Sequence, residues 1–113
     1  VSVDPVQFYK CLADDTRLRC LMLIVKNQEL CVCELTEALD LSQPKVSRHL
    51  AQLRKAGLLT DRREGQWVFY ALNLNLPEWC LIVLEQSFQA LPSFTKKNQQ
   101  RLEQMEDRPN RCC

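Results

Sequence analysis

The sequence predicts a single, mainly α-helical domain that carries one small β-hairpin. Apolar residues recur at helical spacing in several segments, whereas the alternation typical of strands is confined to the stretch around Gly65. The only other glycine, Gly57, falls where a helix is expected to end. A length of 113 residues suffices for one such domain and one hydrophobic core.

Two helices are expected near the N-terminus. A short one is marked by Val6, Tyr9, Leu12 and Ala13. Asp14 is a good N-cap for the second helix, which ends at Asn27–Gln28. The apolar stripe of that second helix, spaced as a buried face requires, consists of Leu18, Leu21, Met22 and Val25.

Two further helices follow in quick succession. Residues 34–39 form a short one, and the turn Asp40–Leu41 leads to Ser42, a good N-cap for a longer helix. That helix runs to about Ala56, and Gly57 is placed as a left-handed C-terminal residue. Two helices joined by a tight turn, the second starting with polar residues, form the helix-turn-helix pattern.

Residues 58–63 and 66–72 are expected to form two strands around a turn at Glu64–Gly65. Arg62, Arg63 and Gln66 cluster at the tip of this hairpin, which makes it a candidate basic wing. The complete order is therefore α-α-α-α-β-β-α, a winged helix-turn-helix.

The last helix begins at Pro77 and is apolar nearly all round before Pro92. A helix of this kind needs a partner, and in so small a domain a second copy of the chain is the expected one, giving a homodimer. Beyond Thr95 the chain is polar and is expected to be frayed. We therefore divide the sequence into a DNA-binding and dimerisation domain, 1–94, and a polar tail, 95–113, that ends in two cysteines.

The net charge is only +1, but between Lys45 and Arg63 the basic residues face a single acid, Asp61. A local basic face of this kind is what binding to double-stranded DNA requires. The sequence holds no run of 18 apolar residues that could span a membrane. Residues 1–10 show no signal-peptide pattern, so a cytoplasmic protein is expected.

The seven cysteines form an odd number, which together with the absence of a signal peptide argues against a disulfide framework. Two pairs are close in sequence, Cys31 with Cys33 and Cys112 with Cys113. The remaining three stand alone within apolar helices and are expected to be core residues; they are Cys11, Cys20 and Cys80.

Three stretches of the sequence stand out together: residues 12–19, residues 29–35 with the Cys-Val-Cys element, and residues 41–50. With the order of elements above, they resemble the arsenic-sensing branch of the ArsR/SmtB family of metal-responsive repressors, over roughly residues 5–84. The resemblance implies a homodimer built from the first and last helices, bound as a repressor to an operator with imperfect two-fold symmetry. It also implies release by trivalent arsenic or antimony as the inducer, with no organic cofactor and no enzymatic activity.

The longer helix that follows Ser42 is the predicted recognition helix of the helix-turn-helix, and its polar face lies opposite Val46, Leu50 and Leu53. Glutamine and arginine at such positions pair with bases, while serine and lysine also contact phosphates. His49 is interpreted either as a phosphate contact or as a hydrogen-bond donor in the core. The candidate DNA-binding residues are Ser42, Gln43, Lys45, Ser47, Arg48 and His49 on the helix, with Arg62 and Arg63 on the wing.

Cys31 and Cys33 are the candidate metalloid ligands, because soft thiolates select soft ions. In a regular helix, residues two apart point to different faces. Either the start of the short third helix is therefore irregular, or metalloid binding distorts it and so moves the recognition helix behind it.

The third cysteine of the family pattern is replaced here by Thr36. Three solutions are open: hydroxide completes a two-thiolate site, another cysteine such as Cys112 or Cys113 supplies the third thiolate, or a singly methylated arsenical needs only two. The alternative function is a redox-sensing repressor of the same fold, in which a close cysteine pair forms a strained disulfide. A thiol-dependent enzyme is disfavoured by the absence of any Cys-x-x-Cys motif.

Overall fold

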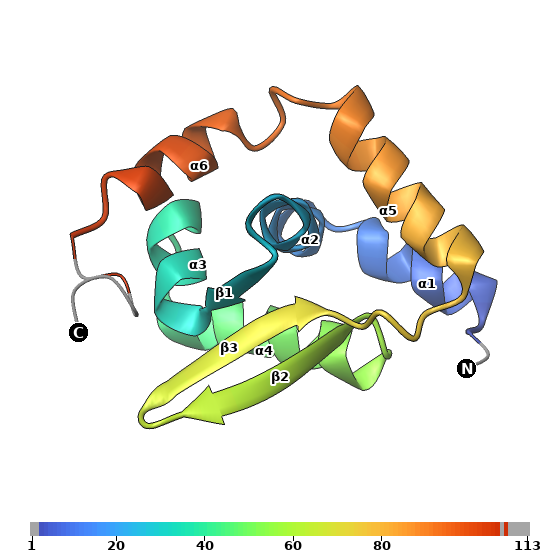
Figure 1. Cartoon of the computed structure of the whole chain (residues 1–113), viewed down its shortest axis with the longest axis horizontal. Coiled ribbons are helices and arrows are strands. Elements are labelled where there is room, and N and C mark those ends of the chain that lie inside the picture. Colours follow the sequence, from blue (N-terminus) through green and yellow to red (C-terminus); the bar gives the residue numbers. More distant parts are fainter. Residues whose placement is uncertain (1–2, 107, 109–113) are drawn as a thin grey trace.

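The computed structural model describes residues 3–106 and 108. Its elements, in chain order, are α1 (Pro5–Leu12), α2 (Asp15–Asn27), β1 (Glu29–Cys31), α3 (Val32–Leu39), α4 (Gln43–Lys55), β2 (Leu59–Glu64), β3 (Trp67–Leu72), α5 (Glu78–Ala90) and α6 (Lys96–Glu103). Helix α2 runs through the middle of the molecule, and the other elements surround it (Figure 1). None of the described helices is long and apolar enough to cross a bilayer.

The predicted helix-turn-helix and hairpin are confirmed, and three local signals explain their boundaries. The Asp14 carboxylate caps α2 by accepting from the backbone N–H of Arg17 at 3.0 Å. The Ser42 hydroxyl caps α4 by accepting from the N–H of Lys45 at 3.4 Å. Gly57 follows α4 with φ +89°, a left-handed conformation that residues other than glycine rarely adopt.

The hairpin belongs to a three-stranded antiparallel sheet in the order β1-β3-β2. Glu64 pairs with Trp67, so the turn residues are Gly65 and Gln66, one position later than expected. Strand β1 pairs Cys31 with Phe69 and was missed, because three residues are too few to show alternation. This short strand attaches the segment before α3 directly to the wing.

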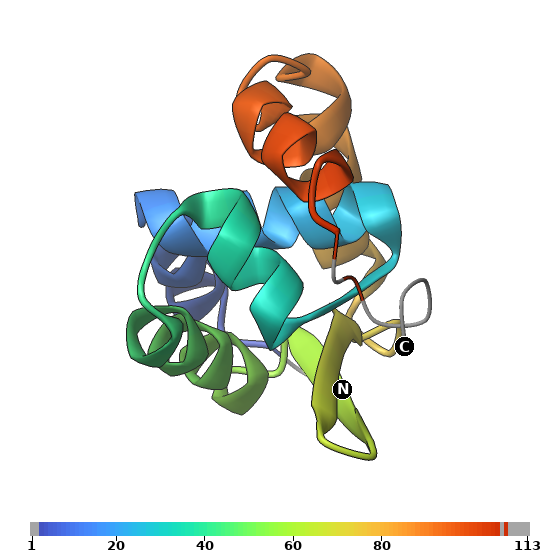
Figure 2. The ribbon, with the colours of Figure 1, turned by 90° about the vertical axis from the view of Figure 1, so that its left-hand side faces the viewer.

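The expectation of a frayed chain beyond Thr95 is wrong for residues 96–103, which form α6. This helix lies over α3 (Figures 1 and 2) and buries Leu102 completely. Asn98 Nδ2 donates to the carbonyl of Ala38 at 2.9 Å, and Arg101 Nε donates to that of Glu37 at 2.9 Å. Because α6 has a single core residue, its sequence shows no apolar stripe.

Helix α5 buries Cys80 and Leu84 against the core, but its outer face stays apolar and exposed. Ile82 on that face is 50% exposed, and Trp79 stacks edge-on against Phe8 of α1 with ring centroids 5.0 Å apart. Tyr9, the next residue of α1, is 51% exposed. Helices α1 and α5 thus share an apolar surface that none of the residues 3–106 and 108 covers.

Candidate functional site

The N-terminal half of α4 presents the predicted polar face to solvent. Ser42, Gln43, Lys45 and Arg48 are exposed, while Ser47 is half-buried and accepts a hydrogen bond from Gln43 Nε2 at 3.0 Å. The opposite face is fully buried and comprises Val46, Leu50 and Leu53. The helix therefore stands on the core with its hydrogen-bonding side chains outward, as a groove-reading helix requires.

His49 points inward from the same helix and is buried. Its Nδ1 lies 3.9 Å from the Asp14 carboxylate and has no hydrogen-bond partner within the described part of the chain. Of the two interpretations of His49, this position fits a core residue between α2 and α4 rather than a phosphate contact.

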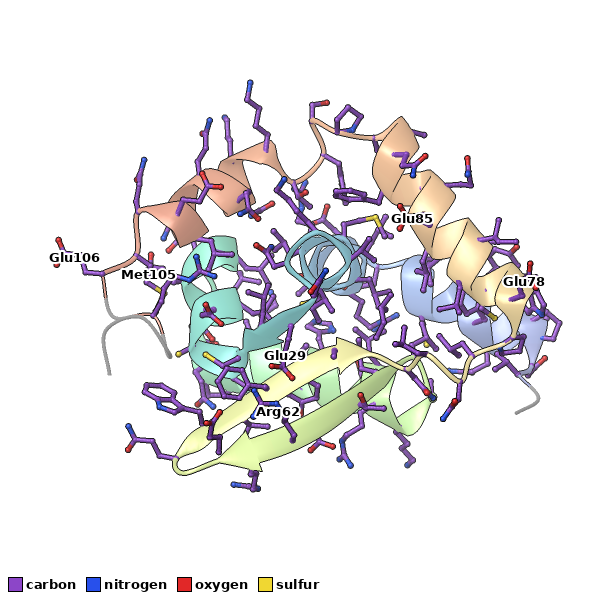
Figure 3. All side chains as sticks on the ribbon, viewed as in Figure 1. Glu29, Arg62, Glu78, Glu85, Met105 and Glu106 are labelled. Carbon is purple, nitrogen blue, oxygen red and sulfur yellow. The ribbon has the colours of Figure 1, made fainter. Side chains whose placement is uncertain are left out.

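The two wing arginines differ in their surroundings. Arg62 forms a bidentate pair with Glu29 of β1, at 2.7 and 2.8 Å, and a third contact with Glu64 at 3.0 Å. Its guanidinium also lies 4.4 Å from the centre of the Phe69 ring, and Figure 3 shows Arg62 and Glu29 meeting above the sheet. Arg63 is exposed and makes no ion pair with any residue in 3–106 or 108, which leaves its charge available to a ligand.

Cys31 and Cys33 bring their sulfurs together, with Sγ atoms 2.8 Å apart as free thiols. Cys31 ends β1 and is the N-cap of α3, with extended backbone angles of −86° and 166°. The expectation that the two cysteines point to different faces of one helix therefore does not apply, because only Cys33 lies within the helix. The side chains already form a dithiol without any distortion of α3.

Burial raises the pKa of both thiols. The pKa of Cys31, which is fully buried, is raised further by its hydrogen bond with Cys33. The same contact lowers the pKa of Cys33, but desolvation outweighs it, and the pKa remains above the ordinary value. Both groups are consequently protonated thiols at neutral pH.

The carboxylate of Glu34 supports the dithiol from behind. Glu34 Oε1 accepts from the backbone N–H of Cys31 at 2.9 Å, and Glu34 Oε2 accepts from Arg108 Nε at 2.6 Å. Only 4% of Glu34 and 6% of Arg108 are exposed. Sequence reasoning missed both residues, although the spacing of an N-cap with an acid three residues later is a capping-box signal.

Two cavities meet at Cys33. The first, of about 370 Å³, joins both cysteines to Gln43 and Ser47 of α4 and to Arg63 of the wing. The second, of about 390 Å³, lies between Cys33, Thr36, Arg101 and Met105. The first cavity places the dithiol next to three of the predicted DNA-binding side chains, those of Gln43, Ser47 and Arg63.

Thr36, at the position of the missing cysteine, donates its hydroxyl to the carbonyl of Val32 at 2.8 Å. Over residues 3–106 and 108, no three His, Cys, Asp or Glu side chains are grouped so that they could hold a metal ion. Cys11, Cys20 and Cys80 are buried in the core, where burial raises the pKa of Cys20 to about 12. Cys112 and Cys113 lie outside the described residues.

Residues 14–61 match the family model described as "Bacterial regulatory protein, arsR family". The chain is 53% identical over 105 residues to the arsenic resistance transcriptional regulator ArsR1 of Pseudomonas putida, covering 93% of this chain and 82% of that protein. It is 50% identical over 84 residues to the arsenical resistance operon repressor of Escherichia coli, covering 74% of this chain and 72% of that protein.

Solved structures show the same fold. HlyU from Vibrio cholerae superposes with a TM-score of 0.68 at 36% identity, covering 75% of this chain and 88% of that one. The antimony-specific transcriptional repressor AntR superposes with a TM-score of 0.65 at 30% identity, covering 77% of this chain and 76% of that one.

Proposed function

This chain belongs to the arsR family of bacterial regulatory proteins, and we propose that it is a homodimeric repressor which trivalent arsenic or antimony releases from operator DNA. It is a transcriptional regulator and not an enzyme. The observation that carries the proposal is the dithiol of Cys31 and Cys33, which opens onto the groove between the recognition helix and the wing. A repressor of bacterial operators acts in the cytoplasm, where the chromosome lies.

DNA binding is assigned to the exposed face of α4 and to the wing. Gln43 and Arg48 have the donors and acceptors that pair with adenine and guanine in the major groove. Ser42, Lys45 and Ser47 are placed to hold phosphates or base edges beside them. On the wing, Arg63 supplies a charge that pairs with no residue in the described part of the chain, whereas Arg62 stabilises the sheet through Glu29.

The dimer is assigned to the apolar surface of α1 and α5. In a two-fold dimer the same surface serves both copies, so Trp79 and Ile82 would meet their equivalents or neighbours across the axis. A pair of recognition helices held in this way reads half-sites one helical turn apart, about 34–36 Å.

The inducer chemistry follows from the protonated state of the thiols. Arsenous acid condenses with two of them, As(OH)₃ + 2 RSH → (RS)₂AsOH + 2 H₂O, and each thiol proton leaves with a hydroxide as water. No base is needed to deprotonate the sulfurs first. A divalent metal cation would have to displace both protons, so raised thiol pKa values disfavour it relative to a neutral hydroxide of arsenic or antimony.

Release follows because ligand and DNA compete for one groove. A metalloid held by Cys31 and Cys33 occupies space beside Gln43 and Ser47, and it lies where β1 joins the wing. Driving an operator from nearly full to nearly empty occupancy requires about 5.5 kcal/mol of preference for the released state. Two arsenic–sulfur bonds that form well only off DNA can supply it.

The test is operator binding, followed by fluorescence anisotropy while arsenite is added under reducing conditions. The double variant Cys31→Ser, Cys33→Ser should bind operator as the parent does and stay bound with arsenite. Cys11→Ser and Cys80→Ser, which change buried cysteines elsewhere in the core, should release normally. Release of the double variant at the parent's arsenite concentration would show that the inducer binds elsewhere.

The alternative function, a redox-sensing repressor, is favoured less by the same site. Thiolates are the species that oxidants attack, and burial keeps both sulfurs protonated. Titration of the operator complex with hydrogen peroxide separates the two functions, because an arsenic sensor keeps its DNA at peroxide concentrations that would release a redox sensor.

A further inference from the structure

We propose that a basic cavity beside the recognition helix α4, lined by Lys10, Arg17 and Lys55, binds one phosphate of the DNA backbone in each half-site. The inference rests on the proposed function and adds to it a DNA contact outside the predicted reading face and the wing. None of the DNA-binding residues predicted from the sequence lines this basic cavity.

The basic cavity has a volume of about 520 Å³ and lies between α1, α2 and α4. Three cationic side chains line it, and no carboxylate is among its lining residues in the described part of the chain. Lys10 and Lys55 are exposed and form no ion pair with any residue in 3–106 or 108. Asp14, which accepts from the backbone N–H of Arg17, is not a lining residue. A concave surface with several positive charges and no carboxylate of its own attracts an anion.

Arg17 joins the three helices around the basic cavity. Its Nε donates to the carbonyl of Cys11 at 3.1 Å, and its Nη2 donates to the carbonyl of Lys10 at 3.0 Å. Its Nη1 donates to Gln52 Oε1 of α4 at 3.1 Å. The last carbonyls of a helix carry partial negative charge, which would repel a phosphate, and the guanidinium offsets that charge at the end of α1. Because these bonds use three of the five N–H donors of a guanidinium, two donors remain for an anion.

The basic cavity continues the exposed side of α4. That side carries a stripe of four exposed residues, spaced three or four positions apart as on one face of a helix: Lys45, Arg48, Gln52 and Lys55. The first two belong to the predicted DNA-binding residues, and the last two line the basic cavity. Arg48 and Lys55 are seven positions apart, about 10 Å along the helix axis. This distance corresponds to about three nucleotides of one strand, so a phosphate beside the bases that α4 reads can reach the cavity.

The expected occupant is a phosphate of DNA and not a free anion. Both lysines are exposed, and salt screens the attraction between exposed charges and a free ion. A duplex that already lies on α4 presents its phosphates at high effective concentration. Binding of a DNA phosphate also releases counterions from the duplex, which favours the complex.

The first test is the salt dependence of DNA binding by the double variant Lys10→Gln, Lys55→Gln. The slope of log affinity against log salt concentration should become shallower than that of the parent by about 0.9 for each half-site bound. Affinities for operator and for nonspecific duplex should fall by the same factor, because a phosphate contact carries no sequence information. An unchanged slope would overturn the inference.

The matched control is the double variant Lys96→Gln, Lys97→Gln, which removes the same charge from two exposed positions at the start of α6. It should keep the slope of the parent. A loss of slope equal to that of Lys10→Gln, Lys55→Gln would show that net charge, and not the basic cavity, determines the effect, and would contradict the inference.

The second test locates the phosphate. Uncharged methylphosphonates replace single backbone phosphates of the operator, one position at a time. At one position in each half-site the parent should lose affinity, whereas Lys10→Gln, Lys55→Gln should not. Inorganic phosphate, added at constant ionic strength, should leave the operator affinity of the parent unchanged. Competition by inorganic phosphate that is absent in the double variant would assign the basic cavity to a free anion and overturn the inference.

Arsenite separates failure of this inference from failure of the proposed function. Lys10→Gln, Lys55→Gln keeps Cys31 and Cys33, so arsenite should release it from operator at the concentration that releases the parent. A double variant with the parent's slope and normal release contradicts the basic cavity alone. A parent that arsenite does not release contradicts the proposed inducer, while the salt and methylphosphonate measurements still decide the phosphate contact.

Discussion

Arg108 and Glu34, separated by 74 positions in the sequence, meet in a buried ion pair with 2.6 Å between Nε and Oε2. The second oxygen of Glu34 holds the backbone N–H of Cys31. One carboxylate therefore connects the C-terminal segment, the start of α3 and the dithiol. The proposed inducer site therefore depends on three chain segments and not on α3 alone.

Arg48→Ala should weaken operator binding by about 1–3 kcal/mol, the range expected for loss of a bidentate contact to guanine. Arg48 is exposed on the outward face of α4, so the variant should fold normally. Anisotropy titrations against the operator and against an operator changed at one G·C pair measure the effect. Equal affinity of parent and variant for both DNAs would show that Arg48 reads no base.

Arg63→Ala should weaken specific and nonspecific DNA binding alike. It should also reduce the slope of log affinity against log salt concentration by the amount expected for about one phosphate contact. Arg62→Ala is the matched control, since Glu29 and Glu64 already neutralise its guanidinium. It should leave the salt slope nearly unchanged. A larger loss of slope for Arg62→Ala than for Arg63→Ala would reverse the roles assigned to the two arginines.

Ile82→Asp should convert the protein to monomers and abolish operator binding, because a charge replaces a half-exposed apolar residue of the α1–α5 surface. The control is Leu74→Asp, which changes a residue that is 78% exposed and lies outside α1 and α5. Sedimentation velocity at micromolar concentration distinguishes the species. A monomeric parent would refute the dimer.

Asp14→Ala should lower the free energy of unfolding by about 1 kcal/mol at pH 7, the usual cost of losing an N-cap. Asp14→Asn retains an acceptor and should stay close to the parent. The hydrogen bond from the Arg17 N–H, the largest cause, lowers the Asp14 pKa in the folded state. The ionised Asp14 cap thus contributes to the free energy of unfolding above about pH 4, and this contribution is lost as the pH falls further. The free energies of unfolding of the parent and the Ala variant should therefore converge in acid.

Alkylation of Cys33 by a small neutral reagent should be slower at pH 7 than that of an unstructured cysteine, and its rate should keep rising through pH 9. Burial raises the pKa of this thiol, and only the thiolate reacts. Peptide mass spectrometry after timed quenching measures the rate at each pH. A rate that levels off near pH 7 would indicate a stable thiolate and would favour the redox function.

The sequence by itself determined the elements whose causes are local. Asp14 and Ser42 cap their helices through hydrogen bonds to residues three positions away, and Gly57 takes the left-handed angle that ends α4. The polar face of α4 follows from helical spacing alone. The residue types alone also predict that the cysteine pair is a soft ligand, since two close cysteines are soft ligands in any conformation.

Tertiary structure decided everything that depends on distant partners. Arg62 and Arg63 look equivalent in sequence, and only the pairing of the sheet brings Glu29 to the first. The sulfurs of Cys31 and Cys33 meet because β1 ends on Cys31, which β3 makes possible by pairing Phe69 with it. Helix α6 and Arg108 leave no pattern of their own, because one buried leucine and one buried ion pair gain their free energy from α3 and not from neighbours in the chain.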